Sequence, residues 1–405
     1  MNILQKLHIN LKKILATTLV FVMITYYYLY VVSPQLTAWL PLILMVGIAL
    51  SGVILIDFAL TNKLTRWHCK YLLFYIAVLG ISVIFQWPNV AWLALTSSTL
   101  LILKRDEFIK IFFYISVGFY LLVIALALFG VLPMVYVGFD GNESQRYGFA
   151  KYSLGFDGPN QASLSFFPIL LSGMYFYGTR RVFTGIALIA CIAVGILTGS
   201  RTGFLLSLAF IPAYRLLLHK HGERKKSTIA PYLFIIGLLV SCIGAAVLVD
   251  NDLANRIMSG RPKLIDQYLQ SEYTPSVFGS DEVYNKAQYG TPPVDNFPVY
   301  IYARYGIIGF IIFAFVFWQG MRRERSTKMY ILFLFLILYG FAEAFSSRPL
   351  YSAVSASVRV KADADAATGI VASKKPCRSA SPSRCFGVLT MSASVACASA
   401  RRFSI

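Results

Sequence analysis

Long apolar runs with almost no charged residue recur along the first 350 residues of this chain. Each run is long enough to cross about 30 Å of hydrocarbon as a helix, which takes roughly 20 apolar residues. Only 14% of the residues are charged and 57% are hydrophobic, whereas a soluble protein has roughly 25% charged residues. The sequence therefore predicts an all-α polytopic membrane protein.

The pattern predicts about eleven transmembrane helices. They cover residues 14–32, 38–57, 71–87, 89–103, 109–132, 161–177, 182–198, 202–218, 230–249, 299–318 and 329–345. The third and fourth runs are short and are separated at Pro88, which favours a break in the helix. These two runs form either two spans or a re-entrant pair.

Basic residues indicate the orientation of the spans. Twenty of the 37 Lys and Arg residues lie on the same side as the N-terminus, 9 lie in the opposite loops, and 8 lie after residue 350. Because Lys and Arg concentrate in cytoplasmic loops, the N-terminus is expected in the cytoplasm. The net charge of +19 then reflects topology, and it gives no reason to expect nucleic-acid binding.

Two substantial loops fall on the outer side, at residues 133–160 and 250–298. The second is the longest polar segment of the chain, and a connection of this size is usually functional. The transmembrane domain is expected to cover residues 1–350. Residues 351–405 are rich in Ala, Ser and Arg, which predicts a low-complexity, disordered tail. The abrupt change of composition also fits a shifted reading frame or a truncated gene.

Cysteine and histidine offer no outer-face chemistry. The six cysteines form no Cys-x-x-Cys pair, so neither a zinc site nor a disulfide framework is expected. All four histidines fall on the cytoplasmic side of the predicted topology. Reactions at the outer face must therefore use Arg, Lys, Asp, Asn and Tyr.

Arginine on the outer side needs a reason, and Arg201 is the clearest case. It lies in the turn Thr198-Gly199-Ser200-Arg201-Thr202-Gly203 between two predicted spans. There a guanidinium could bind a phosphate or pyrophosphate through two hydrogen bonds. The alternative is a side chain that simply reaches from the span end to the interface. Arg146, Arg261 and Arg304 are further outer arginines.

The order of these motifs resembles the O-antigen and capsular polysaccharide polymerases of the Wzy type, within the O-antigen ligase superfamily. The resemblance covers roughly residues 1–350 and rests on five short segments, at residues 155–160, 198–203, 259–261, 295–296 and 305–309. No single segment is specific; their order, spacing and sidedness carry the likeness.

The resemblance implies a glycosyltransferase in the bacterial cytoplasmic membrane that works on the outer face without a metal or other cofactor. It would transfer a growing glycan from undecaprenyl pyrophosphate onto a new lipid-linked repeat unit, beside a flippase and a chain-length regulator. The catalytic residues expected are Arg201, Arg146, Arg261, Arg304, Asp157 and Asp295. The substrate-binding residues expected are Asn160, Asn296, Lys151 and Tyr305.

The chain departs from the superfamily in two places. The ligases generally carry an outer histidine in the large loop, and this chain has Asp295 and no outer histidine, which favours polymerase over ligase. Gly158 stands where a histidine often precedes the Pro-Asn pair. A ligase, a transporter such as a lipid-linked oligosaccharide flippase, and a purely structural membrane subunit remain the alternatives. A transporter usually shows two matching halves, which this sequence lacks.

Overall fold

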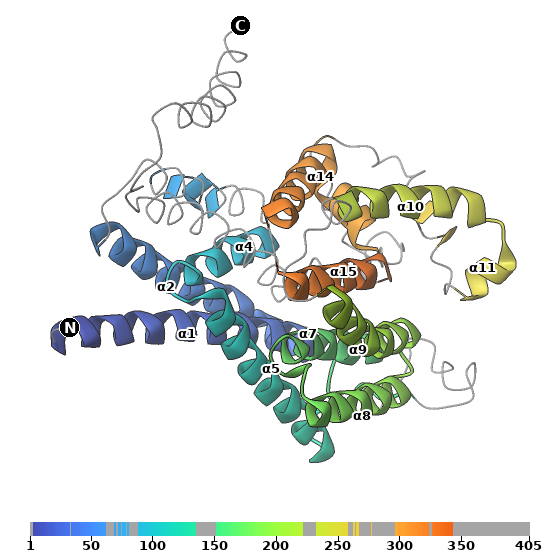
Figure 1. Ribbon diagram of the computed structural model, residues 1–405, viewed down its shortest axis with the longest axis horizontal. Coiled ribbons are helices and arrows are strands. Elements are labelled where there is room, and N and C mark those ends of the chain that lie inside the picture. The colour runs from blue at the N-terminus through green and yellow to red at the C-terminus, as the bar shows by residue number, and fades with distance from the viewer. Residues whose placement is uncertain are drawn as a thin grey trace, which may run out of the picture. The chain divides into compact units, whose positions relative to one another are not determined.

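The computed structural model (Figure 1) describes residues 3–32, 34–61, 69, 72–73, 75–77, 79–80, 88–134, 151–221, 232–257, 262–263, 265–266, 277, 296–323 and 326–342. The chain divides into two compact units, Met1–Ala362 and Asp363–Ile405, and every described residue belongs to the first. Much of the third predicted span, most of the second outer loop and the whole predicted tail lie outside the described residues.

The described residues form helices and no β-strand. The elements are α1 (Ile3–Val32), the 3₁₀ helix η1 (Pro34–Trp39), α2 (Leu40–Thr61), α4 (Pro88–Thr99), α5 (Arg105–Leu128), α7 (Pro159–Tyr177), α8 (Arg181–Thr198), α9 (Arg201–His221), α10 (Leu233–Leu248), α11 (Asp252–Ile257), α14 (Phe297–Arg323) and α15 (Thr327–Ala342). This confirms the all-α class.

Within the described residues, six helical segments are long and apolar enough to cross a membrane. They are Ile9–Val32, Leu36–Thr61, Arg105–Leu128, Arg181–Thr198, Arg201–His219 and Phe297–Phe315. Helix α4, in the fourth predicted span, has only 12 residues and is about 18 Å long at 1.5 Å per residue. The total of about eleven spans stays a prediction.

Helix α8 shows how the apolar residues divide between the interior and the outside. Ala187, Cys191 and Val194 are buried, whereas Val182 is 77% exposed and Ile189 is 69% exposed. In water this outward face would carry polar side chains. A large aliphatic face turned outward fits contact with lipid tails, and it supports the assignment of the chain to a membrane.

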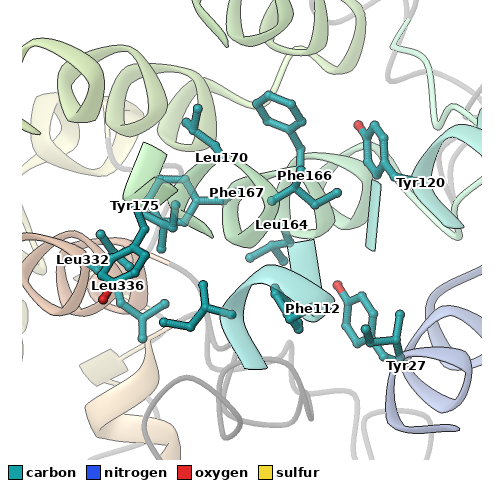
Figure 2. Close-up of a cluster of buried hydrophobic side chains, with 14 of the residues drawn as sticks. Tyr27, Phe112, Tyr120, Leu164, Phe166, Phe167, Leu170, Tyr175, Leu332 and Leu336 are labelled. Atoms are coloured by element: carbon teal, nitrogen blue, oxygen red, sulfur yellow. The ribbon is translucent and has the colours of Figure 1, made fainter. Parts of the chain in front are cut away.

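Helix α7 lies at the centre of the largest core, packed against α5, α8, α9 and α15. Fifteen of its nineteen residues are buried, and Figure 2 shows its Leu164, Phe167 and Leu170 among aromatic and leucine side chains of its neighbours. Two of its serines bond within the helix: the Ser165 hydroxyl donates to the Gln161 carbonyl and the Ser172 hydroxyl to the Pro168 carbonyl, both at 2.7 Å. Because α7 has little surface in contact with lipid, it can be less apolar than the helices at the periphery of the bundle.

Charged pairs join the helix ends at one end of this bundle. Lys12 of α1 pairs with Asp57 of α2 at 2.8 Å, and Lys13 pairs with Glu107 of α5 at 2.9 Å. The Tyr175 hydroxyl, near the end of α7, donates to Asp106 of α5 at 2.8 Å. Helices α1 and α5 therefore begin at the end where α2 and α7 finish. Lys12 and Lys13, two of the basic residues that predicted a common cytoplasmic side, both lie at this end of the bundle.

Candidate functional site

Residues 151–158 form a loop that crosses the opposite end of the bundle and leads into α7. The Tyr152 amide donates to the Leu197 carbonyl of α8 at 2.9 Å. The Gly155 amide donates to the Pro133 carbonyl, beyond the end of α5, at 3.0 Å. The Asp157 amide donates to the Val31 carbonyl of α1 at 2.8 Å. Main-chain hydrogen bonds thus tie this loop to the final turns of α1 and α8 and to the segment that follows α5.

The backbone of this loop is constrained at two consecutive positions. Gly155 has φ 88°, and a Cβ there would lie 2.8 Å from the Val123 carbonyl oxygen and 3.1 Å from the Ala127 Cβ. Both the conformation and the space therefore require glycine. Leu154 has φ 54° and is buried, which costs on the order of 1 kcal/mol for a non-glycine residue. The packing of the loop holds this conformation.

The loop and the first turn of α7 present two exposed polar side chains from a mostly buried segment. Asp157 and Asn160 are exposed, while Phe156 and Gly158 beside Asp157 are buried. Lys151, at the start of the loop, is half-buried. Three of the residues predicted as catalytic or substrate-binding therefore lie on one short segment of fixed backbone.

Arg201 begins α9, and its turn lies against the start of α7. Gly199 ends α8 in the left-handed conformation, with φ 60°. The Thr198 hydroxyl donates to the Val194 carbonyl at 2.7 Å and accepts the Ser200 amide at 3.3 Å. These contacts hold the turn, and the Arg201 side chain is exposed.

Gly203 explains how α9 comes so close to α7. A Cβ at Gly203 would lie 2.0 Å from the Ser163 hydroxyl of α7 and 2.9 Å from the Tyr339 hydroxyl of α15. Ser163 lies three residues after Asn160. The N-terminal parts of α9 and α7 therefore touch, which brings Arg201 to the same end of the bundle as Asp157, Asn160 and Lys151.

Three other predicted residues lie in a second core, between α10 and α14. Asn296 caps α14: its side-chain oxygen accepts the Val299 amide at 3.1 Å, and its side-chain nitrogen donates to the Ser241 hydroxyl of α10 at 2.9 Å. The Tyr305 ring is 1% exposed, and the Arg304 guanidinium lies 6.0 Å from its centroid. Through these contacts, Asn296 and Tyr305 stabilise the fold.

Helix α14 breaks immediately after Tyr305. Gly306 has φ 67° and ψ −168°, a conformation essentially restricted to glycine. The Ile308 amide donates to the Val277 carbonyl at 3.2 Å, so the long loop that is predicted to lie on the outer side supplies a partner at the break. Residues 305–309, which contributed to the family resemblance, therefore contain a helix break. They also contain a close approach between Gly309 and Tyr305, because a Cβ at Gly309 would meet the Tyr305 Cβ at 2.1 Å.

The structure thus brings Lys151, Asp157, Asn160 and Arg201 to one end of the bundle and places Asn296, Arg304 and Tyr305 in the other core. Arg146, Arg261 and Asp295 lie outside the described residues. In the described part of the chain, no three His, Cys, Asp or Glu residues gather as a metal-ion site. Sequence reasoning missed Phe156, Ser163 and Tyr339, whose importance depends on contacts between distant segments.

No family model matches this chain, and no curated protein or solved structure is detectably similar to it.

Proposed function

We propose that this protein is a membrane glycosyltransferase of the polysaccharide-polymerase class, acting on lipid-linked oligosaccharides at the outer face of the bacterial cytoplasmic membrane. The observation that carries the proposal is that Arg201, Lys151, Asp157 and Asn160 lie at one end of a helix bundle whose exterior is apolar. It fits a substrate that is anchored in the bilayer and carries a pyrophosphate at the interface.

The proposed reaction needs two kinds of group, and this end of the bundle supplies both. A hydroxyl oxygen of the acceptor sugar forms a bond to the anomeric carbon of the donor glycan. The bond between that carbon and the pyrophosphate oxygen breaks, and the electron pair leaves with the lipid pyrophosphate. Arg201 and Lys151 stabilise the charge on the leaving group. Asp157 accepts the hydroxyl proton, and Asn160 binds sugar hydroxyls.

The proposal predicts that Arg201 acts through its planar guanidinium and not through charge alone. A guanidinium forms two parallel hydrogen bonds to a phosphate, which the lysine ammonium cannot reproduce. Both Arg201→Lys and Arg201→Ala should therefore lower chain elongation, by about 10²–10³-fold for the loss of one preorganised contact. If Arg201 only reaches for the interface, lysine should serve nearly as well.

The assay is the ladder of glycan lengths in cells that lack the native copy of the gene, with membrane insertion measured in parallel. Arg180 provides a matched control, because it is an exposed arginine between α7 and α8 at the opposite end of the bundle. Arg180→Ala should leave the ladder intact. A normal ladder from Arg201→Lys, with only slight impairment in Arg201→Ala, would remove the phosphate-binding role.

A further inference from the structure

The loop that carries Asp157 is fixed by an aromatic side chain as well as by its backbone. Phe156 is 1% exposed, and its ring centroid lies 5.4 Å from that of Tyr120 on α5 and 6.2 Å from that of Tyr28 on α1. Tyr120 packs in turn against Phe166 of α7 at 5.9 Å. Phe156 therefore packs against α5 and α1, and through Tyr120 it is linked to α7, while Asp157, the next residue, is exposed.

The contacts on either side of Phe156 leave the loop little freedom. On one side, Leu154 and Gly155 have positive φ, and the Gly155 amide donates to the Pro133 carbonyl. On the other side, the Asp157 amide donates to Val31 of α1. The Phe156 ring links these two attachments, so its loss would free a segment that otherwise holds an unfavourable conformation.

We propose that Phe156 is a positioning residue that keeps Asp157 and Lys151 in a fixed place relative to Arg201. The inference rests on the proposed function, because it assigns the loop a task in glycosyl transfer. It goes further by locating the fixing point inside the bundle, at a side chain with no access to the substrate. A shift of about 1 Å in a reacting group lowers rates by up to about 10²-fold, so a looser loop should slow the reaction more than it weakens binding.

The test compares Phe156→Leu with Phe108→Leu. Phe108 is an equally buried phenylalanine, also 1% exposed, in the first turn of α5 at the charged end of the bundle. Both variants replace a buried ring with a leucine, so both should lose similar thermal stability. Only Phe156→Leu should affect the loop and the reaction.

Two readouts are needed, on purified protein in lipid nanodiscs. The first is hydrogen–deuterium exchange of residues 152–157, whose amides are hydrogen-bonded; exchange should be slow in the wild type and Phe108→Leu, and at least tenfold faster in Phe156→Leu. The second is the rate of polymer formation from lipid-linked repeat units extracted from cells without the native gene. There kcat should fall at least tenfold in Phe156→Leu, while KM changes less than threefold.

The outcomes separate the two levels of the argument. Equal exchange in the wild type and Phe156→Leu would overturn the positioning role, whatever the activity. Faster exchange with an unchanged kcat would also overturn the positioning role, because greater mobility of the loop would then leave the reaction rate unaffected. A wild-type protein that shows slow loop exchange but forms no polymer would instead refute the proposed function. Phe156 would then have only a packing role.

Discussion

The close approach of α9 to α7 at Gly203 predicts that a larger residue at this position destabilises the protein. An alanine Cβ at position 203 would lie 2.0 Å from the Ser163 hydroxyl oxygen and 3.1 Å from the Ser163 Cβ, inside ordinary contact distance. Ser163 is 4% exposed and Tyr339 is 1% exposed, so both side chains are enclosed by their neighbours. The helices must separate, or Ser163 must change its rotamer.

The expected cost follows from two opposing effects. Overpacking of this kind costs about 1–3 kcal/mol, and replacing a helical glycine by alanine returns up to about 1 kcal/mol. A net loss of about 1–2 kcal/mol should lower the midpoint of thermal unfolding by a few degrees. Separation of α9 from α7 would also displace Arg201, so glycan elongation should fall as well.

A matched control and a rescue make this prediction specific. Gly185 lies within α8, and a Cβ there would meet nothing within 4 Å, so Gly185→Ala should leave the unfolding midpoint unchanged or raise it. Adding Ser163→Gly to Gly203→Ala should recover most of the lost stability, which a double-mutant cycle would measure as a coupling of about 1 kcal/mol or more. Equal midpoints for the two alanine variants, with no coupling to Ser163, would refute the reasoning.

Two further predictions test other parts of the account. Reporter domains fused near Lys226 and Arg325 should behave as cytoplasmic, and a fusion near Tyr273 as external; a cytoplasmic signal at Tyr273 would reverse the assignment of the candidate site to the outer face. Asn296→Ala should destabilise the protein by about 1–2 kcal/mol, because it removes the cap of α14 and the bond to Ser241, whereas a substrate ligand would lower activity with little change in thermal unfolding.

The all-α membrane class was predictable because it depends on local properties of the chain. Apolar runs of sufficient length signal helices wherever the chain crosses hydrocarbon, and the predicted boundaries of α8 and α9 differ from the observed ones by only a few residues. The break at Gly306 within the tenth predicted span was not foreseen, although a glycine in Tyr305-Gly306 is the residue type that such a break requires.

The arrangement of the candidate site depended on contacts that a pattern of residues does not encode. The sequence singled out the segment before α7 and the turn before α9 as polar interruptions, but it did not indicate that Gly203 touches Ser163. It also grouped Arg304 with Arg201 because both fall on the predicted outer side. In the structure, Arg201 lies at one end of the main bundle, whereas Arg304 lies beside the second core. The convergence of all the predicted outer arginines on one phosphate is therefore a separate hypothesis from the role of Arg201.

The two ends of the main bundle are held together by different kinds of interaction, and this difference is itself a reason to look for chemistry at one of them. At the charged end, side chains do the joining, as in the pair of Lys12 with Asp57 and that of Lys13 with Glu107. At the end crossed by residues 151–158, main-chain amides donate to carbonyls of α1, α8 and the segment after α5, and the Ser153 hydroxyl adds a bond to the Pro133 carbonyl. Since the backbone secures the loop there, Asp157 and Asn160 stay exposed and accessible to a ligand. A loop that served only to link two spans would have no need for a left-handed leucine, a glycine packed against a carbonyl and a buried phenylalanine next in sequence to an exposed aspartate.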